Sequence, residues 1–104
     1  MLIKDFTMKK KNYYLVYKDK YDRIHCHPIG LALKLMRKYN NMSLSYASSS
    51  LNIHRNTLSK YEHEESNIPL VAFVELAKLY NMSVMDLYNE QDMLDIRINI
   101  NRRM

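Results

Sequence analysis

The sequence predicts a mainly α-helical domain of five short helices, with a small β-hairpin before them and a β-strand after them. Three observations lead to this expectation. Strand-forming residues flank a polar turn in residues 12–27, apolar residues recur at helical spacing over 29–88, and they alternate with polar ones over 94–101. With 104 residues, 47% of them hydrophobic, the chain is long and apolar enough for one domain with a core.

The hairpin is expected in NYYLVYKDKYDRIHCH, residues 12–27. Tyr, Val and Ile are common on both sides of KDK, which is the composition of two strands joined by a polar turn. Pro28 and Gly30 then interrupt the pattern. The sequence therefore predicts that the strands end where the helices begin.

The first two helices are predicted from their apolar faces and their ends. A helix from residue 29 has one apolar face, made by Ile29, Leu33, Met36 and Tyr39. Asn40-Asn41 closes it. Ser43 is the expected N-cap of a second helix, whose inward residues are Ala47, Ser48 and Leu51. Asn52 can adopt the left-handed conformation that ends a helix, and Ile53 fills the turn.

Three more helices follow by the same criteria. The third is expected from Arg55 to Glu62, with Leu58 and Tyr61 as its buried stripe. After the loop SNIP, Leu70 opens a fourth helix in which Val71, Val74, Ala77 and Leu79 repeat at helical spacing and which Asn81 ends. Ser83 is expected to cap a short fifth helix, VMDLYN, with Leu87 facing inward.

The end of the chain changes to a period of two. Leu94, Ile96, Ile98 and Ile100 alternate with Asp95, Arg97, Asn99 and Asn101, which predicts a half-buried strand within residues 93–101. A single strand is not stable by itself. We expect it to pair either with the N-terminal hairpin or with the same strand of a second chain.

These patterns divide the chain into three parts. Residues 1–28 form an N-terminal extension, residues 29–88 a helical domain and residues 89–104 a tail for sheet addition or dimerisation. The net charge is +5, of which residues 1–28 carry +4, residues 29–88 carry +1 and the tail none. This charge, with a pI near 9.3, suits a partner rich in phosphate. A protein with a composition heavy in Lys and Tyr can also have a high pI when it has no phosphate-rich partner.

Cysteine usage and hydropathy suggest a compartment. One cysteine, Cys26, allows no intramolecular disulfide, which fits a reducing compartment. The chain has no apolar run of signal-peptide length and no stretch near the roughly 20 apolar residues of a membrane span. We therefore expect a cytoplasmic protein that does not bind membranes.

The helical part resembles the Cro/phage-repressor-type (Xre-like) helix-turn-helix family of transcriptional regulators. The resemblance rests on IGLALKLMRKYNNMS, LSYASSSLNIHRNTLSKYE and NIPLVAFVELAKLYNMSVMDLY, about residues 29–88. It implies a five-helix, lambda-repressor-like DNA-binding domain. Ser43 matches the cap of the second helix, and Ser48 a small residue that lets the two helices pack closely. The hydrophobic positions that hold the recognition helix match Leu51, Ile53, Leu58 and Tyr61.

The resemblance also implies the functional residues. The base-reading positions of the family fall on Arg55, Asn56 and Lys60. Their chemistry agrees, because Arg and Lys donate to guanine and Asn can bond bidentately to adenine. DNA-contacting or flanking roles are expected for Ser43, His54, Thr57, Ser59, Lys34 and Lys38, with Lys9, Lys10 and Lys11 as further phosphate contacts. Arg37 and Glu62 match a structural pair that orients the recognition helix.

The chain departs from the family pattern at two positions. Leu44 stands where a Gln often touches the DNA backbone, which puts one phosphate contact in doubt. Glu64 replaces the Gly that commonly follows the recognition helix, so the turn there must differ or be strained. Glu64 and Glu65 also bring negative charge near the expected DNA surface, where they either lower non-specific affinity or point away.

Other kinds of site are not supported. On a strand, His25 and His27 share one face and Cys26 takes the other, so the three cannot chelate one ion. No zinc-ligand spacing, no catalytic triad and no glycine-rich phosphate loop is found in the sequence. We expect no enzyme activity, no metal and no cofactor.

We therefore expect a sequence-specific, double-stranded DNA-binding transcriptional regulator, a repressor that binds a palindromic operator as a homodimer. The alternative is an antitoxin, or another protein-binding module, that uses the helix-turn-helix fold. A protein partner would then bind through the N-terminal hairpin or the C-terminal strand.

Overall fold

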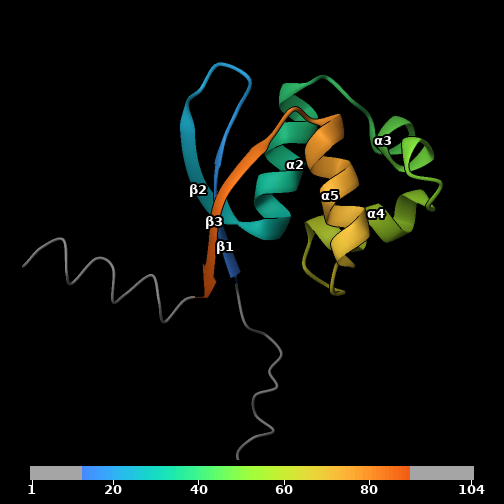
Figure 1. The fold of residues 1–104 in the computed structure, drawn as a ribbon. Helices are drawn as coiled ribbons and strands as arrows, with labels where there is room; N and C mark the ends of the chain where they lie inside the picture. Colours follow the sequence, from blue (N-terminus) through green and yellow to red (C-terminus); the bar gives the residue numbers. More distant parts are fainter. Residues whose placement is uncertain (1–12, 90–104) are drawn as a thin grey trace, which may run out of the picture.

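The computed structural model describes residues 13–89, which form four helices and a three-stranded sheet. In chain order the elements are β1 (Tyr13–Lys18), β2 (Ile24–Pro28), α2 (Ile29–Tyr39), α3 (Leu44–Ser50), α4 (Arg55–Glu62), α5 (Leu70–Leu79) and β3 (Ser83–Asn89). In Figure 1 the sheet lies on one side of α2, and α3, α4 and α5 lie on the other. The four helices from 29 to 79 confirm the helical part of the prediction.

The predicted hairpin is present. β1 and β2 pair antiparallel, with Val16 opposite Cys26 and Lys18 opposite Ile24. The turn between them is held by the backbone of Asp19, whose N–H donates to the Arg23 carbonyl at 3.0 Å, and by Asp22 in the left-handed conformation (φ 64°). β2 passes directly into α2 at Pro28, so the strand and the helix share a boundary as the sequence predicts.

The predicted fifth helix is wrong, because residues 83–89 form β3. This strand pairs antiparallel with β1, on the side opposite β2, so the strand order is β2-β1-β3. Ser83 therefore caps no helix, and Leu87, opposite Leu15, is still 49% exposed. A helix of six residues is marginal by itself. Pairing instead satisfies the backbone donors and acceptors on the second edge of β1, and Val, Leu and Tyr suit a strand.

The core lies between the sheet and the helices. Its buried members are Leu15 and Tyr17 of β1, Ala32, Leu33 and Met36 of α2, Ala47 of α3, Leu58 of α4, Leu76 and Ala77 of α5, and Tyr80 and Met82 after α5. Leu51 and Tyr61 are half-buried against this core. Two residues of the predicted apolar faces are less buried than the core, since Tyr39 is 38% exposed and Val71 is 74% exposed.

All four helices end in the same way, without glycine. The residue after each C-cap has a left-handed φ: Asn41 (57°), Asn52 (63°), Glu64 (59°) and Asn81 (56°). The N–H of the next residue then bonds a carbonyl in the last turn, as from Met42 to Arg37 and from Ile53 to Ser48, both at 3.0 Å. This is the Schellman arrangement, in which Asn replaces Gly most readily. The predicted helix ends at Asn41, Asn52 and Asn81 are confirmed.

The predicted C-terminal strand at residues 93–101 lies outside the described residues, and so do Lys9, Lys10 and Lys11.

Candidate nucleic-acid interface

α3 and α4 form the helix-turn-helix unit. The turn between them, residues 51–54, depends on Asn52 in the left-handed conformation and on Ile53, whose side chain packs against the core. Ala47 and Ser48 of α3 are buried, and the Ser48 hydroxyl donates to the Ser45 carbonyl at 3.2 Å. The hydroxyl of Ser48 is therefore satisfied within its own helix, so a small polar residue can occupy this buried position.

Side chains cap the N-termini of both helices. Oγ of Ser43 accepts from the N–H of Tyr46 at 3.0 Å, which confirms the predicted cap of α3. At the start of α4, Nδ1 of His54 accepts from the N–H of Asn56 at 3.0 Å. His54 was expected only to contact or flank DNA, and the structure gives it this capping role. The bond requires the Nδ1 atom of His54 to be unprotonated.

A buried ion pair fixes the orientation of α4 on α2. The Arg37 guanidinium bonds both carboxylate oxygens of Glu62, at 2.7 Å (Nε to Oε2) and 3.1 Å (Nη2 to Oε1). Its Nη1 also donates to the Met42 carbonyl at 2.8 Å. The two side chains are 8% and 1% exposed, and the bonds to Glu62 raise the pKa of Arg37. The predicted structural pair is confirmed, with the bidentate geometry that suits Arg.

Burial of one face of α4 turns the other outward. Leu58 and Glu62 are buried, while Arg55, Asn56 and Lys60 are exposed. Thr57 and Ser59 are half-buried beside them. At 100° per residue, Asn56 and Lys60 lie on the side opposite Leu58 and Glu62, whereas Arg55, seven residues before Glu62, lies near the side of Glu62 and is exposed in the first turn. The three expected base-reading side chains are thus all exposed, Asn56 and Lys60 on the outer face of α4 and Arg55 at its start.

The predicted conflict at Glu64 has a structural explanation. Glu64 takes the left-handed conformation (φ 59°) in the Schellman turn, where the N–H of Glu65 donates to the Lys60 carbonyl at 2.8 Å. Oε2 of Glu64 accepts from the N–H of Gly30 at 2.9 Å, in the first turn of α2. The carboxylate therefore points away from the exposed face of α4. It supplies α2 with the cap that Pro28 cannot provide, and its charge suits a helix N-terminus.

Sequence reasoning missed this contact between Gly30 and Glu64. A Cβ atom on residue 30 would meet the carbonyl oxygen of Glu62 and lie 2.7 Å from Cγ of Glu64. The one glycine of the chain thus stands where the end of α4 packs on the start of α2. Two signals in the sequence point to this contact: a glycine at the start of a helix and a Pro cap without a side-chain acceptor.

The remaining expected residues lie on α2. Lys38 is exposed and Lys34 half-buried, one turn apart and on the side away from Ala32 and Met36. No hydrogen bond or ion pair of either side chain is found within residues 13–89.

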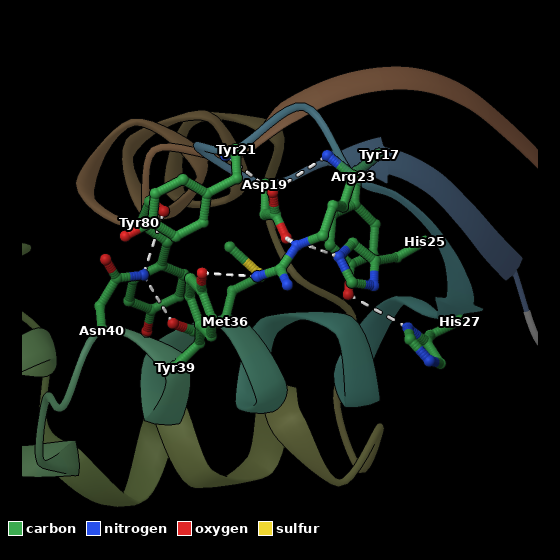
Figure 2. Close-up of polar contacts among 10 residues, drawn as sticks. All are labelled: Tyr17, Asp19, Tyr21, Arg23, His25, His27, Met36, Tyr39, Asn40 and Tyr80. Carbon is green, nitrogen blue, oxygen red and sulfur yellow. Dashed lines mark hydrogen bonds and ion pairs between the residues drawn. The ribbon is translucent and has the colours of Figure 1, made fainter.

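A second polar cluster lies at the hairpin, on the sheet face that contacts α2 (Figure 2). The Asp19 carboxylate accepts from the N–H of Tyr21 at 2.8 Å, from Nε of Arg23 at 3.0 Å and from Nε2 of His25 at 2.9 Å. Burial acts to raise the pKa of Asp19, but the hydrogen bonds from His25, Arg23 and Tyr21 hold it well below its usual range. Asp19 therefore stabilises the turn as a carboxylate.

Two histidines complete the hairpin cluster. His25 and His27 lie on one face with ring centroids 6.0 Å apart, and Cys26 is exposed on the other face, as predicted for a strand. Nδ1 of His27 shares a hydrogen bond with the Tyr17 hydroxyl at 3.1 Å. Burial and the charge of His25 lower the pKa of His27, and burial raises the pKa of Tyr17 to about 12. Residues 13–89 contain no group of three metal-ligating side chains placed to hold an ion.

The fold and the exposed face of α4 define a helix-turn-helix domain of the DNA-binding kind. The sequence profile of this helix-turn-helix family matches residues 33–87, more than half of the chain, so the protein belongs to the Cro/phage-repressor-type (Xre-like) helix-turn-helix family. It is a family of DNA-binding regulators, typically without enzyme activity. Searches of curated proteins and of solved structures find no match to the chain.

No helix within residues 13–89 has the length and apolar character needed to cross a lipid bilayer.

Proposed function

We propose that the protein is a sequence-specific, double-stranded DNA-binding transcriptional regulator, a repressor that binds a palindromic operator as a homodimer. One observation carries the base-reading assignment: α4 is anchored by Leu58 and Glu62 and turns Arg55, Asn56 and Lys60 outward. A rigid helix with exposed donors is what readout in the major groove requires.

Each exposed residue of α4 has a defined task in this proposal. Arg55 and Lys60 donate to O6 and N7 of guanine, and Asn56 forms a bidentate pair with adenine. Thr57 and Ser59 contact the neighbouring backbone, and the capped helix starts at Ser43 and His54 direct N–H groups at phosphates. Lys34 and Lys38 add phosphate contacts that carry no sequence information.

Exposed apolar residues at the start of α5 support a dimer. Leu70 is 75% exposed, Val71 74% and Val74 38%, and the three lie on one side of the helix. We propose that a second copy covers this patch with its own, and on a palindromic operator the two α4 helices would then lie about one turn of DNA apart, roughly 34 Å. Val71→Asp is then expected to convert the dimer to a monomer in light scattering, whereas Glu75→Gln leaves the mass unchanged.

Selection of bound fragments from random duplex DNA, followed by footprinting, identifies the operator. Against that operator we expect Arg55→Ala to lose about 1–3 kcal/mol of preference over random DNA. Lys38→Ala should weaken binding to both DNAs about equally, because a phosphate contact is blind to sequence. Lys78→Ala, on α5, serves as the control for loss of one exposed charge. Unchanged preference in Arg55→Ala would show that α4 does not read bases.

The second candidate function is that of an antitoxin or another protein-binding module. The observation that favours it is the apolar exposure of β3, where Val84, Met85 and Leu87 are each close to half exposed. A toxin-sized neighbouring gene or a co-purifying protein would support it. A salt titration separates the two functions, since a DNA binder with several phosphate contacts loses affinity steeply as the salt concentration rises.

A further inference from the structure

Among the described strands, β3 lies at one edge of the sheet. In the order β2-β1-β3 its only neighbour within residues 13–89 is β1. The N–H of Leu87 donates at 2.8 Å to Oδ1 of the preceding Asp86, which is exposed. The exposed carboxylate of Asp86 thus accepts the hydrogen bond that the carbonyl of a neighbouring strand would accept. We infer that Leu87 directs its backbone groups toward the side away from β1, where another strand can pair.

The side chains of β3 are also incompletely covered. Leu87 lies opposite Leu15 and Val84 opposite Tyr17, so both share the sheet face of these two buried residues. Leu87 is nevertheless 49% exposed and Val84 45% exposed. Apolar side chains on the core face of a sheet are covered when the sheet continues beyond them. Both the outward backbone groups of Leu87 and the exposure of these apolar side chains therefore point to one more strand.

The chain that follows β3 has the composition of such a strand. Residues 94–101, LDIRININ, alternate strictly between apolar and polar side chains. Only residues 90–93 separate them from Asn89, the last residue of β3. A connection of four residues is within the usual length of an antiparallel hairpin loop.

A four-residue loop also sets a register that fits the side chains. With Asn89 opposite residue 94, Ile96 falls opposite Leu87 and Arg97 falls opposite Asp86. The apolar residues of the tail then share the core face with Leu87, and opposite charges meet across the outer face. A shift by one residue would put every isoleucine on the outer face.

We propose that residues 94–100 of the same chain pair antiparallel with β3 as a fourth strand, which extends the sheet to β2-β1-β3-tail. The short connection favours the tail of the same molecule over that of a second copy, because an adjacent segment loses little loop-closure entropy. The added strand covers Leu87 and satisfies its outward backbone groups.

Nuclear Overhauser spectra of the full-length protein test the register. Because Leu87 and Ile96 would exchange backbone hydrogen bonds, Asp86 and Arg97 form the closer pair, and a strong contact between their Hα protons is expected. The Leu87 and Ile96 amides should exchange slowly with solvent. Ile96→Asp should abolish the Asp86–Arg97 contact, whereas Asp95→Asn, which changes a residue of the outer face, should keep it.

Mixed labelling decides which molecule supplies the strand. In a sample of labelled protein diluted tenfold with unlabelled protein, a contact within one chain keeps its intensity per labelled molecule. A contact between copies falls with dilution and appears in half-filtered spectra of mixed dimers. A contact that keeps its intensity on dilution supports the proposal. Loss on dilution, contacts from residues 1–12 to β3, or fast exchange at Leu87 and Ile96 would each overturn it.

Discussion

The N–H of Gly30 donates to the Glu64 carboxylate at 2.9 Å, so the residue that follows the C-cap of α4 also caps the start of α2. The two helices are further joined by Arg37 and Glu62 in the last turn of α2. Two contacts along α2 therefore fix the axis of α4, and with it the positions of its exposed side chains. The acid at residue 64, which departs from the family pattern, has a structural task.

Loss of the Glu64 cap should destabilise the fold modestly. We expect Glu64→Ala to lower the free energy of unfolding by about 1 kcal/mol, the usual value of an N-cap side chain. Glu64→Gln keeps an acceptor and should lose less. Glu64→Gly loses the acceptor but relieves the strain of the left-handed backbone. Its loss of stability should lie between those of Glu64→Ala and Glu64→Gln. Urea denaturation measures all three, with Glu65→Ala as the neutral control. A neutral Glu64→Ala would refute the capping role.

A side chain at residue 30 should destabilise the fold more than loss of the Glu64 cap does. In Gly30→Ala the new Cβ meets the backbone carbonyl of Glu62, which cannot move without shifting α4. We expect a loss of about 1–3 kcal/mol, as for other overpacked sites, together with weaker DNA binding. Chemical shifts of α4 amides in the folded fraction report the movement of the helix. Wild-type stability and unchanged shifts would contradict the close packing of α2 and α4.

The Arg37–Glu62 pair should show strong coupling between its two residues. Arg37→Met leaves the Glu62 carboxylate buried without its partner and should cost about 3–5 kcal/mol. The double variant Arg37→Met, Glu62→Leu removes both charges and should recover most of that loss. A double-mutant cycle in urea gives the coupling energy. Additive effects of the single changes would mean that the pair does not act as a unit.

Acidification should weaken the hairpin in two stages. Because the pKa of His27 is lowered in the folded protein, its imidazole binds a proton more readily in the unfolded chain than in the folded one. The free energy of unfolding is therefore full above the ordinary pKa of 6.5 and declines below it. The lowered pKa of Asp19 gives stability that is present above 3.8 and is lost as the pH falls further. Unfolding free energies from pH 8 to pH 3 test this. His27→Gln should remove the first decline, and Asp19→Asn the second.

Local signals in the sequence determined most of the helical part. The apolar spacing places α2 to α5, Ser43 marks the start of α3, and Asn residues mark three helix ends. These features involve residues a few positions apart, so that a single segment already contains the information. The family resemblance added the Arg37–Glu62 pair, which periodicity alone does not reveal.

Only the tertiary structure decided the state of residues 83–89 and the task of Glu64. VMDLYN is compatible with a helix or a strand, and the choice depends on an open edge of β1 far away in the chain. The carboxylate at residue 64 has no partner among its sequence neighbours, since its donor is the N–H of Gly30 on another helix. Contacts between distant segments select among local conformations of similar energy, and the sequence of one segment does not contain them.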